Sequence, residues 1–238
     1  MNVRILLPTF NENDNIEGIL RRIFEVVPQA SVLVIDDASP DGTGRTVARL
    51  AEEFENVKLL DRARREGLGR AYIAGIAESL EDADGECADA IITMDADFSH
   101  DPGHLPEMIE AAASHDVVIG SRYVRGGGVA DWEAWRRALS AGGNLYSRMV
   151  TGMPVRDATS GFQLVRTEAL RKIGYRRIAA SGYAFQIELK YRLWRSGARL
   201  VETPITFQTR RGGESKLSSH IVREGVLTPL RLRFGSGE

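Results

Sequence analysis

Short apolar runs alternate with longer segments of helical spacing through the first half of the chain. Between 16 and 27, Ile16, Ile19, Leu20, Ile23 and Val27 form one apolar stripe, which is typical of a helix packed on one face. The short runs predict buried strands at 3–7, 32–35, 57–60, 90–94 and 117–119. The segments between them predict helices at 16–27, 43–53, 69–80 and 106–114, the first capped by Asn13 or Asp14.

This alternation predicts an α/β fold with a Rossmann-like, mostly parallel central sheet flanked by helices. The rhythm changes after about residue 125, where the glycines at 126–128 could form a hinge or a simple connection. Later predicted elements are a helix at 132–151, a strand at 162–165, a helix at 185–196, strands within 199–207 and a helix at 218–234. Pro229 would kink or split that last helix.

Composition adds limits on the class of protein. The chain has 238 residues, 43% of them hydrophobic, and a single cysteine, which excludes an intramolecular disulfide framework. No apolar run approaches the ~20 residues of a transmembrane helix, and no basic region leads into a signal-peptide core at the N-terminus. We therefore expect a cytoplasmic protein.

The small net charge of −2 hides an asymmetry between the two parts of the chain. Residues 171–238 carry 14 basic and 5 acidic residues, whereas residues 1–170 carry 17 basic and 28 acidic residues. An acidic first part suits a metal, and a basic last part suits phosphates or an anionic membrane. A solvated basic face is the alternative explanation. No nucleic acid partner is expected.

Polar loops follow four of the predicted strands. They begin at Pro8, Asp36, Asp95 and Gly120, and the third of them carries Asp95 and Asp97 directly after a buried run. Ligands of parallel α/β sheets bind beyond the carboxyl ends of the strands, so these loops are expected to share one crevice. The two carboxylates there could hold a hard divalent cation and, through it, a diphosphate. A self-satisfied Asp-rich turn is the alternative.

Two common nucleotide-binding motifs are absent from the sequence. The run from Gly67 to Tyr72 lacks the third glycine of the dinucleotide fingerprint, and no loop ends in Gly-Lys-Ser/Thr. A nucleotide, if bound, is therefore held through a metal and side chains. His100 and His104 could also suggest a zinc hydrolase site, but Pro102 and Gly103 interrupt the helix that this spacing requires.

Seven short motifs occur in an order that resembles a known family. They are Pro8–Glu12, Asp-Asp-x-Ser-Pro-Asp-Gly-Thr at 36–43, Gly67-Leu-Gly69 with Ala71-Tyr72, Asp95-Ala-Asp97-Phe-Ser99-His100, Gly120–Tyr123, Asp157–Phe162, and Arg210 with Gly213–Lys216. Together they resemble the family 2 glycosyltransferases, and within them the dolichol-phosphate (polyprenol-phosphate) mannose synthases.

The resemblance implies a GT-A catalytic domain over residues 1–217, followed by a basic amphipathic helical tail at 218–238. It implies inverting transfer of mannose from GDP-mannose to a polyprenyl (dolichyl) phosphate, with Mg²⁺ or Mn²⁺, at the cytosolic face of a membrane. The tail could lie at the membrane interface or pack on the domain. A UDP-glucose donor, a soluble sugar acceptor, or a non-catalytic nucleotide-binding subunit of a membrane complex are the alternatives.

The resemblance also implies roles for individual residues. The nucleotide-sugar would be held by Pro8, Phe10, Glu12, Ile35, Asp37, Asp95, Ala96 and Asp97. Asp97 would be the direct metal ligand, with Ser99 beside it. Arg122 and Arg137, with Ser140 nearby, would meet the sugar and the acceptor phosphate, although Arg136 adjoins Arg137 and is the alternative at that position. Arg210 and Lys216 would bind the donor diphosphate. A phosphate acceptor is already anionic and needs cations rather than a strong base.

Overall fold

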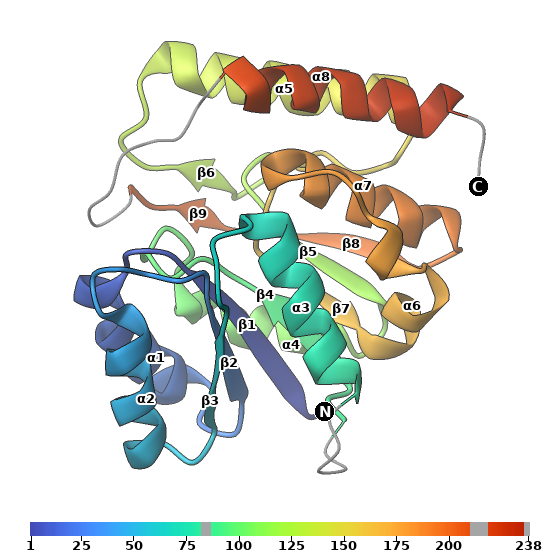
Figure 1. Cartoon of the computed structure of the whole chain (residues 1–238). Coiled ribbons are helices and arrows are strands. Elements are labelled where there is room, and N and C mark those ends of the chain that lie inside the picture. The colour runs from blue at the N-terminus through green and yellow to red at the C-terminus, as the bar shows by residue number, and fades with distance from the viewer. Residues whose placement is uncertain (82–86, 210–218, 236–238) are drawn as a thin grey trace.

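The computed structural model describes residues 1–81, 87–209 and 219–235. Its centre is a seven-stranded sheet of order β3-β2-β1-β4-β7-β5-β8 (Figure 1). The strands are β1 Val3–Thr9, β2 Ser31–Asp36, β3 Val57–Asp61, β4 Ala90–Thr93, β5 Val117–Ser121, β7 Gln163–Arg166 and β8 Leu200–Pro204. All neighbours pair in parallel except β7, which runs antiparallel between β4 and β5. The predicted α/β fold with a mostly parallel sheet is confirmed.

Helices cover both faces of the sheet, because each strand is apolar on both sides. One core cluster joins the sheet to α1 (Asn13–Val26), α2 (Thr43–Glu53) and α4 (Leu105–Ala111). The other joins it to α3 (Leu68–Glu81), α6 (Thr167–Lys172) and α7 (Gly182–Arg195). Short 3₁₀ turns at Pro102–His104 and Tyr175–Arg177 precede α4 and α7.

An outer layer lies beyond α7 and consists of α5 (Ala134–Thr151) and α8 (Ser219–Phe234) (Figure 1). Tyr146 of α5 donates its hydroxyl to the Val226 carbonyl at 2.8 Å. The Ser181 hydroxyl, just before α7, donates to Glu224 at 2.6 Å. The described part of the tail therefore packs on the domain, and Pro229 lies inside α8 without splitting it. Within the described ranges, every helix is too short or too polar to cross a bilayer.

Several local features differ from the predictions. Helix α1 begins at Asn13 after Glu12 without a side-chain cap, because the Asn13 side chain accepts a hydrogen bond from Thr46 instead. The strands predicted within 199–207 are present as β8 and the short β9 (Thr206–Phe207), separated by Ile205. The glycine-rich stretch contributes β6 (Gly128–Val129), which pairs in parallel with β9.

The glycine-rich stretch at 126–128 also makes a close backbone contact. A Cβ at Gly127 would lie 2.4 Å from the Ser121 carbonyl oxygen. Only glycine allows the chain after β5 to fold back this closely. The stretch is a connection that fixes β6 beside the end of β5.

Candidate active site

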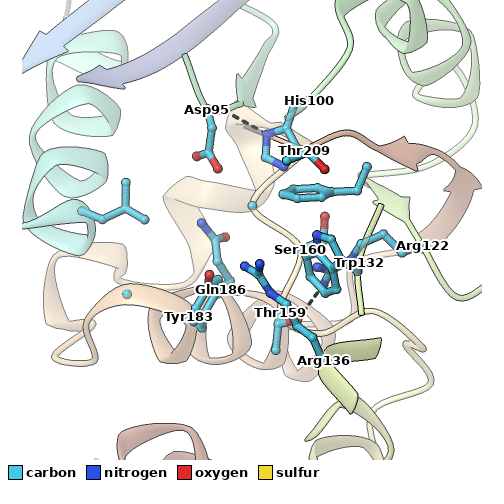
Figure 2. A pocket seen from close by; sticks show the side chains of 14 residues that line it. Asp95, His100, Arg122, Trp132, Arg136, Thr159, Ser160, Tyr183, Gln186 and Thr209 are labelled. Carbon is cyan, nitrogen blue, oxygen red and sulfur yellow. Dashed lines mark hydrogen bonds between the residues drawn. The ribbon is translucent and has the colours of Figure 1, made fainter. Parts of the chain in front are cut away.

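Two of the four polar loops, those that begin at Asp95 and Gly120, border a cavity of about 160 Å³ at one edge of the sheet (Figure 2). Its walls come from α3, the turn after β4, the segment after β5, the beginning of α5 and the segment before it, the end of the α5–β7 connection, α7, and β9 with the segment after it. The lining residues are Leu68, Asp95, His100, Arg122, Trp132, Arg136, Thr159, Ser160, Gly161, Gly182, Tyr183, Gln186, Phe207 and Thr209. The loops that begin at Asp95 and Gly120 therefore share one cavity as predicted, whereas the loops that begin at Pro8 and Asp36 do not line it.

The turn after β4 is held by its own hydrogen bonds. Asp97 is 5% exposed, and its Oδ1 accepts from the Ser99 backbone at 3.0 Å and from the Ser99 hydroxyl at 2.5 Å. Phe98 between them has a positive φ of 62°, which is uncommon for a bulky residue. Asp95 is partly exposed and faces the cavity. The two aspartates thus take different positions, Asp95 at the cavity and Asp97 inside the turn.

His100 stabilises this turn. Its Nδ1 accepts a hydrogen bond from the Asp95 backbone at 2.9 Å, and its ring stacks on Phe162 with centroids 4.9 Å apart. His104 instead accepts from the Thr206 backbone at 3.4 Å through Nε2. Among the described residues, no group of three or more His, Cys, Asp or Glu side chains could hold a metal ion. These contacts give no support to a zinc hydrolase site.

Arg122 and Asp157 form a buried ion pair at the end of β5. The Arg122 guanidinium donates to the two Asp157 carboxylate oxygens at 2.8 and 2.7 Å, and its backbone N–H donates to the same carboxylate at 2.9 Å. Burial alone would raise the pKa of Asp157, but Arg122 outweighs this effect and lowers it. Burial alone would lower the pKa of Arg122, but Asp157 raises it. Both groups remain charged, and Asp157 fixes the orientation of the arginine.

A second, largely apolar cavity of about 400 Å³ adjoins the first. It lies between α5, α7 and α8, and it shares Arg122, Trp132, Arg136, Thr159 and Tyr183 with the first cavity. Ser140 also lines it and accepts a hydrogen bond from the Tyr123 hydroxyl at 2.7 Å. A polar site and an apolar groove therefore meet at two arginines.

Arg136, and not Arg137, lines both cavities. The Arg136 guanidinium lies over the Trp132 ring, 4.5 Å from its centroid, whereas Arg137 is exposed on α5. Adjacent helical positions point about 100° apart, so both cannot face the same cavity. The structure thus places the neighbouring alternative at the position predicted for Arg137.

The residues predicted to hold the nucleotide lie along the ends of β1 and β2. Phe10 carries the Arg65 guanidinium 3.8 Å from its ring centroid, and Glu12 accepts from the Asn15 side chain at 2.8 Å. Pro8 is partly exposed beside them, whereas Ala96 is buried after β4. Phe10 and Arg65 offer flat faces on which a base could stack.

Asp37 and Ile35 have structural contacts of their own. Asp37 forms an ion pair with Arg62 and accepts from the Gly67 backbone at 2.8 Å, so it holds the loop after β3. The Ile35 side chain is fully buried, and its Cδ1 would lie 2.4 Å from a Cβ at Gly75. Only the backbone of Ile35 could reach a nucleotide. Arg210 and Lys216, predicted to bind the diphosphate, lie outside the described residues.

Comparison with known proteins shows the family to which the chain belongs. Residues 4–174 match the family described as Glycosyl transferase family 2. The chain belongs to this family. It is 43% identical over 231 residues to the undecaprenyl-phosphate mannosyltransferase of Micrococcus luteus, covering 97% of this chain and 93% of that protein. Family 2 proteins are glycosyltransferases, so the chain is an enzyme of that class.

Solved structures confirm the GT-A-like fold of this family 2 member. Glucosyl-3-phosphoglycerate synthase from Mycobacterium tuberculosis, in complex with Mn²⁺, UDP-glucose and phosphoglyceric acid, matches with a TM-score of 0.66 at 17% identity, over 100% of this chain and 81% of that one. The mannosyltransferase PcManGT from Pyrobaculum calidifontis, in complex with GDP-Man and Mn²⁺, matches with a TM-score of 0.57 at 16% identity, over 98% and 70%.

The aspartates of this family 2 chain fit a cation that is shared with a diphosphate. Asp95 and Asp97 supply hard oxygen donors, and Mg²⁺ typically takes one or two carboxylates together with substrate phosphates. Burial, and then the negative charges of Asp95 and Asp97, raise the pKa of the Tyr72 hydroxyl well above its usual range. Asp97 and Ser99 would hold the ion, with Asp95 beside it.

Sequence reasoning assigned no role to three residues of this region. Asp157 stands in a quoted motif, so a signal existed, but its pairing with Arg122 required the fold. Gln186 and Lys190 lie on α7, where the sequence shows only a helix. Lys190 is fully buried and donates to the Ser160 carbonyl at 2.6 Å, beneath the loop that lines the first cavity. A buried lysine on an otherwise apolar helix face gives no sequence signal.

Lys190 should make stability depend on pH. Burial lowers its pKa to about 7 from the usual 10.5, although the charge of Asp157 acts in the opposite direction. Between about pH 7 and 10 the unfolded chain keeps a proton that the folded chain has released, so wild-type stability should rise with pH by up to about 1.4 kcal/mol per pH unit. Lys190→Met should lack this rise when urea unfolding is measured at pH 7, 8 and 9. The exposed Lys172→Met is the control, and parallel curves for Lys190→Met and wild type would contradict the prediction.

Proposed function

We propose that the protein transfers mannose from GDP-mannose to a polyprenyl phosphate, with inversion at the anomeric carbon and with Mg²⁺ or Mn²⁺. One observation carries the proposal: the cavity that Asp95 lines adjoins a largely apolar cavity, and Arg122 and Arg136 line both. A diphosphate donor suits the first, an isoprenoid chain suits the second, and an acceptor phosphate suits the two arginines between them.

The chemistry follows from these positions. A nucleotide-sugar diphosphate leaves with developing negative charge, and a bound divalent cation would stabilise that charge. The acceptor phosphate is already anionic, so the protein has to orient it rather than deprotonate it. Arg122, fixed by Asp157, and Arg136, held over Trp132, are placed to do so. Ser140 lies within reach on the same wall.

The names of relatives support the proposed acceptor and, less directly, the proposed donor. The Micrococcus luteus relative is named an undecaprenyl-phosphate mannosyltransferase. The Pyrobaculum calidifontis structure contains GDP-Man and Mn²⁺, whereas the Mycobacterium tuberculosis structure contains UDP-glucose and Mn²⁺. A UDP-glucose-dependent polyprenyl-phosphate glucosyltransferase is therefore the second candidate.

We further propose peripheral contact with the cytosolic face of a membrane, either directly or through a membrane-anchored partner. The outer layer carries large apolar side chains in contact with solvent, namely Trp135, Leu139, Leu145, Met149, Val226, Leu230 and Phe234. Arg137, Arg148, Arg231 and Arg233 lie on the same two helices. Apolar side chains among arginines suit an anionic lipid surface beside the mouth of the apolar groove.

A transfer assay tests the proposal. The protein is incubated with radiolabelled GDP-mannose or UDP-glucose, Mn²⁺ and vesicles that contain a polyprenyl phosphate and anionic lipid. Label should enter the lipid phase from GDP-mannose, and the protein should float with the vesicles. Transfer from UDP-glucose alone would overturn the assignment of GDP-mannose as the donor. Tight nucleotide binding without any transfer would favour a non-catalytic nucleotide-binding subunit. Activity without flotation would overturn direct contact with the lipid surface and leave recruitment by a membrane-anchored partner.

A further inference from the structure

The side-chain amide of Gln186 on α7 is buried and only half satisfied. Gln186 is 1% exposed, and its Oε1 accepts from the Gln163 side chain at 2.7 Å. Its Nε2 has no hydrogen-bond partner among the described residues. A buried donor without an acceptor costs about 1–3 kcal/mol, so such a group in a native protein calls for an explanation.

The unpaired amide faces the first cavity across a narrow space. In Figure 2 the Gln186 amide and the Asp95 carboxylate point into the cavity from opposite sides. A Cβ added at Gly161 would lie 3.6 Å from Gln186 Nε2, 3.6 Å from His100 Cε1 and 4.0 Å from Asp95 Oδ1. Gly161 therefore leaves open a small space that has a hydrogen-bond donor on one wall and a carboxylate on the other.

This space lies where the transferred sugar has to be. Asp95 is on the side assigned to the donor diphosphate, with Asp97 in the turn behind it, and Arg122 and Arg136 are on the side assigned to the acceptor phosphate. The anomeric carbon must lie between the leaving and attacking oxygens, so the sugar ring occupies the cavity between these two groups. Gln186 enters that cavity from α7, which neither group uses.

We propose that Gln186 binds the transferred hexose, with Nε2 donating a hydrogen bond to one of its hydroxyl groups. The proposal rests on the proposed transfer of a sugar from a nucleotide donor, and it adds a residue that contacts the sugar itself. Gln163 holds the other end of the amide, so the donor is oriented before the sugar arrives. A site built to pair with a hydroxyl discriminates strongly against an analogue that lacks it.

The test compares binding of the donor with binding of the same nucleotide without its sugar. Gln186→Met keeps the length of the side chain but removes the amide. We expect this variant to bind GDP-mannose about 10-fold more weakly in the presence of Mn²⁺, with the affinity for GDP unchanged, when both are titrated by calorimetry. Deoxy-mannose donors identify the hydroxyl: one of them should lose affinity for wild type and not for Gln186→Met.

Two further variants separate a sugar contact from a structural role. Thr203 also has a buried hydroxyl without a partner, but it lies on β8 and lines neither cavity. Thr203→Val should change neither affinity. Gly161→Ala would place a methyl group in the open space at ordinary contact distances, so this variant should fold normally. It should bind GDP-mannose more weakly than wild type does, with a smaller loss of affinity for GDP.

The possible results are distinct. Equal weakening of GDP-mannose and GDP by Gln186→Met, or no weakening of either, would overturn the proposal. If the wild-type protein uses UDP-glucose, the assignment of GDP-mannose as donor is overturned but this inference is not. The affinities of wild type and Gln186→Met are then compared for UDP-glucose and UDP.

Discussion

Asp97→Asn should lower metal-dependent sugar transfer by at least about 10³-fold while leaving the fold intact. The change removes the negative charge expected to hold the cation, and loss of about 4 kcal/mol of transition-state stabilisation corresponds to this factor. The asparagine Oδ1 can still accept the hydrogen bonds that Ser99 donates at this position. Transfer at saturating Mn²⁺ and thermal unfolding together measure the two effects.

Two companion variants make this result interpretable. Asp97→Ala removes the charge and the turn hydrogen bonds, so it should be equally inactive and also less stable. Asp101, four residues further on, accepts a similar local hydrogen bond from the Gly103 backbone at 2.8 Å and lines neither cavity. Asp101→Asn should transfer sugar like wild type. Full activity in Asp97→Asn would show that the metal site has been misplaced.

Asp157→Asn should destabilise the protein and impair transfer at the same time. It leaves the Arg122 guanidinium buried, 9% exposed, without its carboxylate. Breaking a buried ion pair in this way costs about 3–5 kcal/mol, which corresponds to roughly 10 °C in melting temperature for a chain of this size. The arginine should also lose its orientation, so we expect transfer to fall by about 10²-fold. Circular dichroism melting and the transfer assay measure both.

An exposed pair and a double variant serve as controls. Arg199 Nη2 lies 3.1 Å from Asp116 Oδ1, and the arginine side chain is 64% exposed. Asp116→Asn should therefore lower the free energy of unfolding by no more than about 1 kcal/mol and leave transfer unchanged. Replacing both buried partners, as Arg122→Met with Asp157→Leu, should restore much of the stability but not the activity. If Asp157→Asn melted like wild type, the pair would have no structural role.

The central sheet could be predicted because its strands are apolar on both faces. Helix α2 has the predicted bounds, and β1 to β5 begin within one residue of prediction. The short β6 was missed for a physical reason: it has two residues and pairs with β9 where Gly127 lets the chain return beside Ser121. A strand of two residues is too short to show the pattern of apolar and polar positions that predicts a strand.

For the candidate site, too, some positions could be predicted from the sequence and others could not. The Asp95–Asp97 turn follows a buried strand, so its position at the sheet edge could be read from the sequence. The choice between Arg136 and Arg137 depends on the rotation of α5, which residue spacing alone does not fix to within one position. Gln186 and Lys190 acquire their roles from burial, because α7 packs them against Gln163 of β7 and the Ser160 carbonyl before it.

The reversed direction of β7 has a consequence for how the chain can be divided. Because β7 runs against its neighbours, its beginning, and not its end, lies at the edge where β4 and β5 finish. The loop before β7 thus enters a cavity that also takes residues from Leu68 in α3 to Thr209 after β9. Contributions from early, middle and late segments are interleaved in space. No contiguous half of this protein contains a complete site, so a split or circularly permuted enzyme could work only after its pieces had reassembled the whole sheet.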